Sequence, residues 1–100
     1  MVLARVKGSV VSTHKTPSLE KLPLLILERV DPVSMKGLND FVVSIDSVGA
    51  NVGEIVFYVT GSSARMTETT REKVSDSTII AIVDNIEIGG KQMYPEVREV

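Results

Sequence analysis

The sequence predicts a small all-β protein with five strands, arranged as a β-barrel or a β-sandwich. Apolar and polar residues alternate with a period of two in several segments, and glycine, proline or aspartate separates these segments at short intervals. Helical periodicity is almost absent. A chain of 100 residues with 43% hydrophobic content is the size of one compact domain with a single core.

Each strand rests on its own local signal. The first is expected over residues 2–10, where Val2, Ala4 and Val6 alternate with charged or polar residues such as Arg5 and Lys7. A polar stretch with a proline follows, and it reads as a loop. By the same signals the other four strands are expected at residues 22–30, 41–46, 54–60 and 79–88.

The remaining segments are expected to be connections. Residues 62–76 are polar and can form one or two short helical turns, with Asp76 as a capping residue. Residues 1–90 are therefore expected to form one barrel domain. Residues 91–100 read as a polar tail that adds a short strand at Met93 and Tyr94 before Pro95 ends it.

Two of the expected strands are apolar on both faces. In residues 79–88, Ile80 and Ile82 share one face, yet Ile79 and Val83 on the other face are apolar too. One barrel core cannot cover both faces of a strand, so we expect the chain to be an oligomer. The apolar residues expected at the subunit interface are Leu25, Leu27, Ile79 and Val83.

Composition argues against several functions. The formal net charge is −2, which gives no bulk attraction to nucleic acid or to an anionic membrane. No apolar run approaches the roughly 20 residues needed to span a bilayer, and the N-terminal segment lacks a secretory h-region. Cysteine is absent, which is compatible with a reducing cytosol. We expect a soluble, intracellular protein.

No catalytic, cofactor or metal site is expected. His14 is the single histidine, lies in a polar segment and has no evident ligand partner, so we expect it at the surface. Ser62 and Ser63 follow Gly61 but lack the Gly-x-Ser-x-Gly nucleophile elbow. The glycine loop at residues 49–53 lacks the Lys-Ser/Thr ending of a phosphate-binding loop. The chain is not expected to be an enzyme.

Two aspartates and one arginine stand out from this background. Asp46 ends one apolar segment and Asp84 interrupts another, so each is expected to be paired or hydrogen bonded, because an isolated buried carboxylate is costly. Arg65 is expected to make a charge-assisted contact within or between subunits, against the alternative of a plain solvated arginine. We expect all three near the subunit interface.

Five fragments in order carry a family resemblance: LARVKGSVVSTHK, LLIL, DSVGANVGE, GSSAR and IIAIVDNI. Together they resemble the EutN/CcmL family of bacterial microcompartment vertex proteins. The resemblance implies an OB-like barrel that assembles into a cyclic pentamer. It further implies a structural function: capping the fivefold vertices of a polyhedral protein shell in the cytoplasm, beside hexameric and trimeric shell proteins.

The sequence departs from the family pattern at three places. Asn51 stands where a second glycine is usual, and it is expected to keep the left-handed backbone that asparagine tolerates. Pro23 stands where lysine is usual; it is expected at an edge or at the start of its strand, where the missing N–H should disturb local pairing. Val74-Ser75 replace Pro-Val before Asp76.

A cyclic ring leaves an axial opening, and small residues suit its lining because they let several chains approach closely. On this ground Gly61, Ser62 and Ser63 are expected at the pore. The alternative for these residues is an ordinary turn stabilised by serine hydroxyls.

The competing interpretation is a monomeric OB-like module that binds a small ligand or single-stranded nucleic acid. The aromatic residues number only four, Phe41, Phe57, Tyr58 and Tyr94, and the phenylalanines are expected at core-facing positions. Without stacking residues or a positive field, the sequence favours the shell protein.

Overall fold

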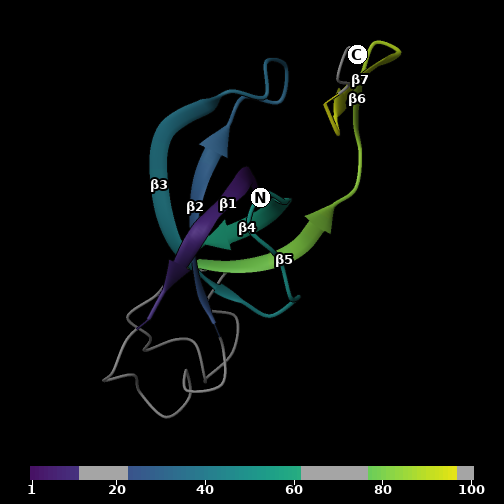
Figure 1. Cartoon of the computed structure of the whole chain (residues 1–100). Helices are drawn as coiled ribbons and strands as arrows, with labels where there is room; N and C mark the ends of the chain where they lie inside the picture. Colours follow the sequence, from purple (N-terminus) through teal and green to yellow (C-terminus); the bar gives the residue numbers. More distant parts are fainter. Residues whose placement is uncertain (12–22, 62–76, 97–100) are drawn as a thin grey trace.

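The computed structural model describes residues 1–11, 23–61 and 77–96, and it shows a closed barrel with a small separate hairpin (Figure 1). The strand order around the barrel is β1-β2-β3-β5-β4, and β1 pairs with β4 to close it. A second, two-stranded sheet follows along the chain. The strands are β1 (Val2–Val10), β2 (Leu24–Val30), β3 (Gly37–Asp46), β4 (Ile55–Thr60), β5 (Ser77–Val83), β6 (Ile86–Ile88) and β7 (Lys91–Tyr94).

Four of the five contacts between barrel strands are antiparallel. The fifth, between β3 and β5, is parallel and has two residue pairs, Ile45 with Thr78 and Asp46 with Ile79. By contrast, β2 pairs with β3 over most of its length, and β1 pairs with both β2 and β4. The barrel is thus a well-paired sheet that is closed by one short seam.

The core lies inside this barrel and follows from the alternation of side chains along each strand. In β1, for example, Ala4 and Val6 are buried while the intervening Arg5 is not. Strands β2, β4 and β5 add their own inward residues, and Val2, Val42, Ala50 and Ile82 pack around them. The buried core cluster is Ala4, Val6, Leu25, Leu27, Val56, Tyr58 and Ile79.

The expected all-β barrel is confirmed, with differences at the strand ends. The predicted strand over residues 79–88 is two strands, because the chain leaves the barrel at Asp84 and Asn85. The short strand expected at Met93 and Tyr94 is present as β7, but it pairs with β6 and not with the barrel. The barrel wall therefore ends at Val83. Strands β6 and β7 form a separate hairpin beyond it (Figure 1).

Two expectations about single residues are wrong. Pro23 does not disturb the pairing of β2, because it lies just before the strand, which pairs from Leu24 onward with both neighbours. Its carbonyl even accepts the Asp46 N–H at 2.9 Å. Asn51 does not adopt a left-handed backbone; that conformation falls on Gly49 and Gly53, with φ of 80° and 95°.

In the described residues, no helix is long and apolar enough to cross a bilayer. The expected helical turns over residues 62–76 lie outside the described residues.

Candidate assembly surfaces

The loop after β3 is organised by the carboxylate of Asp46. This side chain is 4% exposed, and its two oxygens accept three backbone N–H groups: Oδ1 from Val48 (3.0 Å) and Gly49 (3.1 Å), and Oδ2 from Ala50 (3.0 Å). The N–H donors replace the water that the buried carboxylate has lost. Asp46 is thus hydrogen bonded within its own chain, and its expected role at an interface stays a prediction.

Polar side chains reinforce the short seam between β3 and β5. The hydroxyls of Ser44 and Ser77, both fully buried, hydrogen bond to each other across the seam. The Ser47 hydroxyl also donates to the Ile79 carbonyl at 3.2 Å. Side-chain hydrogen bonds therefore supplement the two ladder pairs at the point where the barrel closes.

The structure corrects which face of the strands could meet a partner. Leu25, Leu27 and Ile79 were expected at the interface, yet they lie in the barrel interior with 7%, 0% and 0% of their surface exposed. A side chain enclosed by its own barrel has no surface left for a neighbour. In β2 the alternation predicted from the sequence is present, but the inward and outward rows are exchanged. In β5 the register shift at Ile80 lets both Ile79 and Ile82 reach the core.

The outward row of β2 and β3 forms one partly exposed apolar surface, here called the β2–β3 face. Cross-strand pairing places Ile26 beside Val43 and Glu28 beside Phe41 on the same side of the sheet. Phe41 is 53% exposed and Val43 is 42% exposed, so the expectation that Phe41 faces the core is wrong. The apolar members of the face are Leu24, Ile26, Phe41 and Val43.

A second apolar surface lies on the outside of β1, β4 and β5, here called the β4–β5 face. Leu3 pairs with Phe57, and Phe57 pairs with Ala81, so the three half-buried side chains form a row across the strands. Ile80 lies at the register shift of β5 and is 42% exposed. The barrel is therefore apolar on two outer faces as well as inside.

The other predicted interface and pore residues are spread over different places. Val83 is half-buried at the end of β5, and Asp84 is exposed where the chain leaves the barrel. Gly61 follows β4 with a φ of 64°. Among the described residues, no hydrogen bond or ion pair connects Asp84 with Asp46. Ser62, Ser63 and Arg65 lie outside the described residues.

Sequence reasoning missed Arg5, which links the hairpin to the barrel. From β1, its Nη1 donates to the Gly53 carbonyl at 2.9 Å and its Nη2 to the Glu96 carboxylate at 2.6 Å. The guanidinium also lies 5.8 Å from the centre of the Tyr94 ring. In the sequence, Arg5 is one polar residue of an alternating strand, and nothing local signals contacts to residues about ninety positions away.

At one end of the barrel, a buried tyrosine lies near an ion pair. Arg29 and Asp40 are joined at 3.1 Å, and Tyr58 is 4% exposed inside the barrel. Burial raises the pKa of Tyr58 above its ordinary value of 10.0; the positive charge of Arg29 acts in the opposite direction, and the negative charge of Asp40 raises it further. The phenol therefore stays neutral over the physiological pH range.

In the described parts of the chain, no group of three or more histidine, cysteine, aspartate or glutamate side chains could hold a metal ion. What the geometry offers is extended apolar outer surface on a closed barrel, which is typical of a subunit that buries its outer strands against other subunits. The β2–β3 face and the β4–β5 face together indicate a protein that assembles with other subunits.

Comparison with known proteins gives the family. The sequence profile described as "Ethanolamine utilisation protein EutN/carboxysome" matches residues 1–84. The chain is 36% identical over 94 residues to the carboxysome shell vertex protein CcmL of Synechococcus elongatus, covering 94% of each chain. It is 43% identical over 91 residues to the microcompartment shell vertex protein PduN of Salmonella typhimurium, covering 86% of this chain and 98% of the relative.

Solved structures agree with the sequence relatives. The structure of GrpN, a pentameric microcompartment shell protein from Rhodospirillum rubrum, superposes with a TM-score of 0.76 at 39% identity, covering 88% of this chain and 99% of that chain. EutN from Escherichia coli superposes with a TM-score of 0.80 at 36% identity, covering 94% and 96%. The chain belongs to the EutN/CcmL family of microcompartment shell vertex proteins, a structural and not an enzymatic family, as the sequence predicted.

Proposed function

We propose that five copies of this chain form a ring that caps a vertex of a bacterial microcompartment shell. The observation that carries the proposal is the combination of family membership with two exposed apolar faces on one small barrel. The shell vertex relatives support the same assembly, and one of them, GrpN, is a pentameric shell protein. The role is geometric, because sheets of hexagonal tiles cannot close a polyhedron without fivefold units.

The two faces also fit the symmetry of a ring. A cyclic assembly of five repeats one heterologous contact, in which two different surfaces of the same chain meet. The β2–β3 face and the β4–β5 face lie on different strands, so one can be offered to each neighbour. Association through such a contact stops when the ring closes, and no apolar face is left over.

Several finer features belong to the same proposal. Gly61, Ser62 and Ser63 line the axial opening, and Arg65 and Asp84 contribute polar contacts around the ring. The rim contacts hexameric and trimeric shell proteins, and the assembly lies in the cytoplasm as part of the shell. The small size of the residues at positions 61–63 supports the pore placement.

Native mass spectrometry across a concentration series tests the ring directly. The expected result is a discrete pentamer that persists on dilution, without larger species at high concentration. A monomer at every concentration would refute the assembly and return the chain to the class of small barrel binding modules. The Ser62→Trp variant tests the pore placement. It should add density on the fivefold axis in a cryo-EM map of the pentamer. Unchanged density on this axis would show that residues 61–63 do not line the pore.

A further inference from the structure

Strand β3 carries a bulge directly before Phe41. Glu28 of β2 pairs with Phe41. The next pair joins Val30 to Gly37, so residues 38–40 of β3 lie opposite a single residue of β2. A bulge bends its strand and redirects the side chains beside it. The side chain beside this bulge is Phe41, which at 53% exposure is the most exposed apolar member of the β2–β3 face.

The carboxylate of Glu28 holds this bulge. Its Oε2 accepts the N–H of Asn39 at 3.0 Å, and Asn39 lies in the middle of the bulge with a φ of 57°. Residues of a bulge are left out of the sheet ladder, so their N–H groups need another acceptor. Glu28 Oε1 lies 3.8 Å from Nζ of Lys7, and the Glu28 side chain is 15% exposed. The carboxylate is therefore largely shielded from water where it binds the bulge.

Gly37 leaves the space that this carboxylate occupies. A Cβ atom at position 37 would overlap both oxygens and the Cδ of Glu28. At the other described glycines, a Cβ atom would meet nothing within 4 Å. The φ of Gly37 lies outside the left-handed region, so backbone conformation does not account for this glycine. Glu28, Gly37 and Asn39 thus form one unit, here called the Glu28 cap.

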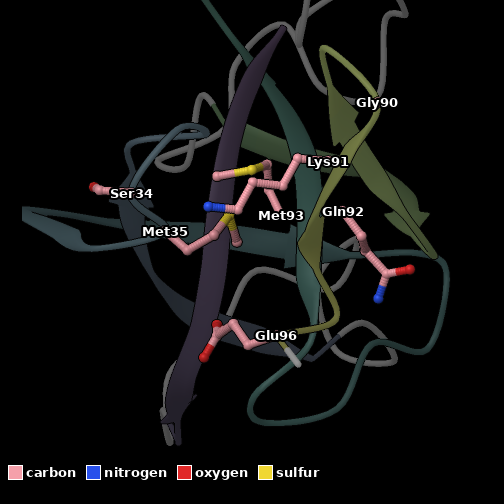
Figure 2. Close-up of a pocket in the computed structure, with 7 residues that line it drawn as sticks. All are labelled: Ser34, Met35, Gly90, Lys91, Gln92, Met93 and Glu96. Atoms are coloured by element: carbon pink, nitrogen blue, oxygen red, sulfur yellow. The ribbon is translucent and has the colours of Figure 1, made fainter. Parts of the chain in front are cut away.

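Two other contacts near the bulge hold the start of β3 less firmly. The Arg29–Asp40 ion pair spans the bulge, but its side chains are 47% and 55% exposed, and exposed ion pairs contribute little. The turn at residues 31–36 faces a hollow of about 600 Å³ that separates it from the β6–β7 hairpin. Figure 2 shows Met35 and Met93 reaching into this hollow from its two sides. The Glu28 cap is therefore the best-shielded side-chain contact at the bulge.

We propose that Glu28 is a positioning residue for ring assembly. By holding the bulge in the space left at Gly37, it sets the direction in which Phe41 leaves the sheet. A second copy of this chain binds Phe41 in that direction. Because the bulge is fixed before contact, less conformational entropy is lost on binding. Glu28 acts through Phe41 and not by touching the neighbour, and the inference rests on the proposed pentamer.

A double-mutant cycle tests the cap. Glu28→Ala removes the acceptor of the Asn39 N–H, and Gly37→Ala displaces the carboxylate from its space. Each change should raise the protein concentration at which half of the pentamer dissociates, measured by native mass spectrometry, by roughly fivefold or more. The double variant should lie no higher than Glu28→Ala, because the added methyl group then meets no carboxylate. Effects that multiply would show that the two residues act independently and would refute the cap.

A second cycle separates positioning from general stabilisation. Phe41→Ala should weaken the ring, and adding Glu28→Ala to it should cause no further dissociation. If Glu28 only stabilises the barrel, it weakens the ring equally with and without Phe41, and the proposal is wrong. Neither residue belongs to the buried core cluster, so the barrel should fold in every variant.

Two single variants complete the test. Glu28→Gln keeps an oxygen that accepts the Asn39 N–H, so its ring should be as stable as that of the natural chain within about twofold. The matched control is Asp40→Ala, which removes the other carboxylate at the bulge and should also leave dissociation within about twofold. A loss with Asp40→Ala as large as that with Glu28→Ala would contradict a specific role of the cap.

The outcomes separate this inference from the proposed function. If the natural chain forms a pentamer and Glu28→Ala dissociates at the same concentration, the positioning role is wrong and the ring stands. If the natural chain forms no pentamer, the proposed function fails and the inference fails with it. A pentamer that shows both cycles as expected supports both.

Discussion

The barrel of this protein and its β6–β7 hairpin with the flanking residues 84–96, called the arm, are held in place by different means. Barrel strands are joined by long ladders and by a core whose central side chains have no exposed surface. The arm is joined to the barrel mainly through one arginine. The difference indicates that the barrel is fixed by many contacts along its strands, whereas the position of the arm depends on a few side-chain contacts.

The largest expected effect is in the barrel core. Leu27→Ala removes a fully buried side chain and leaves a cavity, so the free energy of unfolding should fall by about 2–5 kcal/mol. Urea denaturation at a fixed protein concentration measures the change. Val52→Ala, at a site 69% exposed, should change it by less than about 0.5 kcal/mol. Equal effects of the two variants would contradict the core assignment.

The next effect is at the loop after β3. Asp46→Ala leaves three backbone N–H groups without their acceptor, and the free energy of unfolding should fall by about 1–3 kcal/mol. Asp46→Asn keeps one oxygen acceptor and should recover part of the loss. Thermal denaturation of the two variants beside the natural protein checks the order. If the asparagine variant is the less stable one, the carboxylate is not acting as a loop acceptor.

The arm should respond to a change that hardly affects the barrel. Arg5→Ala removes the contacts to Gly53, Glu96 and Tyr94, so backbone amides of residues 86–94 should exchange with deuterium at least tenfold faster. Amides of β4 should keep their protection. The matched control is Arg29→Ala, which breaks an exposed ion pair on the barrel and should leave exchange in the arm unchanged.

The smallest effect concerns pH. The pKa of Tyr58 is raised in the folded barrel. Below pH 10 the tyrosine is neutral in the folded and in the unfolded chain, so the free energy of unfolding does not depend on its ionisation there. As pH rises through 10, the unfolded chain ionises first and stability is lost. Tyr58→Phe should flatten this part of the stability curve, and urea midpoints from pH 9 to 11 measure it. Parallel curves for the two proteins would show that Tyr58 makes no contribution.

Much of the barrel could be predicted from the sequence because the period of two is a local signal. It gives the strands near Val2, Leu24 and Ile55 almost to the residue. It does not tell which row faces inward when both rows are apolar, as in β2, where Leu25 and Leu27 are inside and Leu24 and Ile26 are outside. That choice is made by the register with neighbouring strands, which is not a local property.

The same limit applies to the arm. Its strands could be recognised from the isoleucines before Gly89-Gly90 and the short run that ends at Tyr94, but not its separation from the barrel. Arg5 and Glu96 are 91 positions apart, and no spacing rule connects them. The pore and polar interface residues at 62, 63 and 65 stay predictions.

The short seam between β3 and β5 has a consequence for how the chain folds. Its two ladder pairs join segments about thirty residues apart, and closing such a contact costs loop entropy before the burial of Ser44 and Ser77 compensates for it. We therefore expect the seam to close late. Until it does, the nascent sheet presents two unpaired strand edges, which are templates for aggregation. Burial of the Ser44 and Ser77 hydroxyls is therefore expected to coincide with the loss of both free edges.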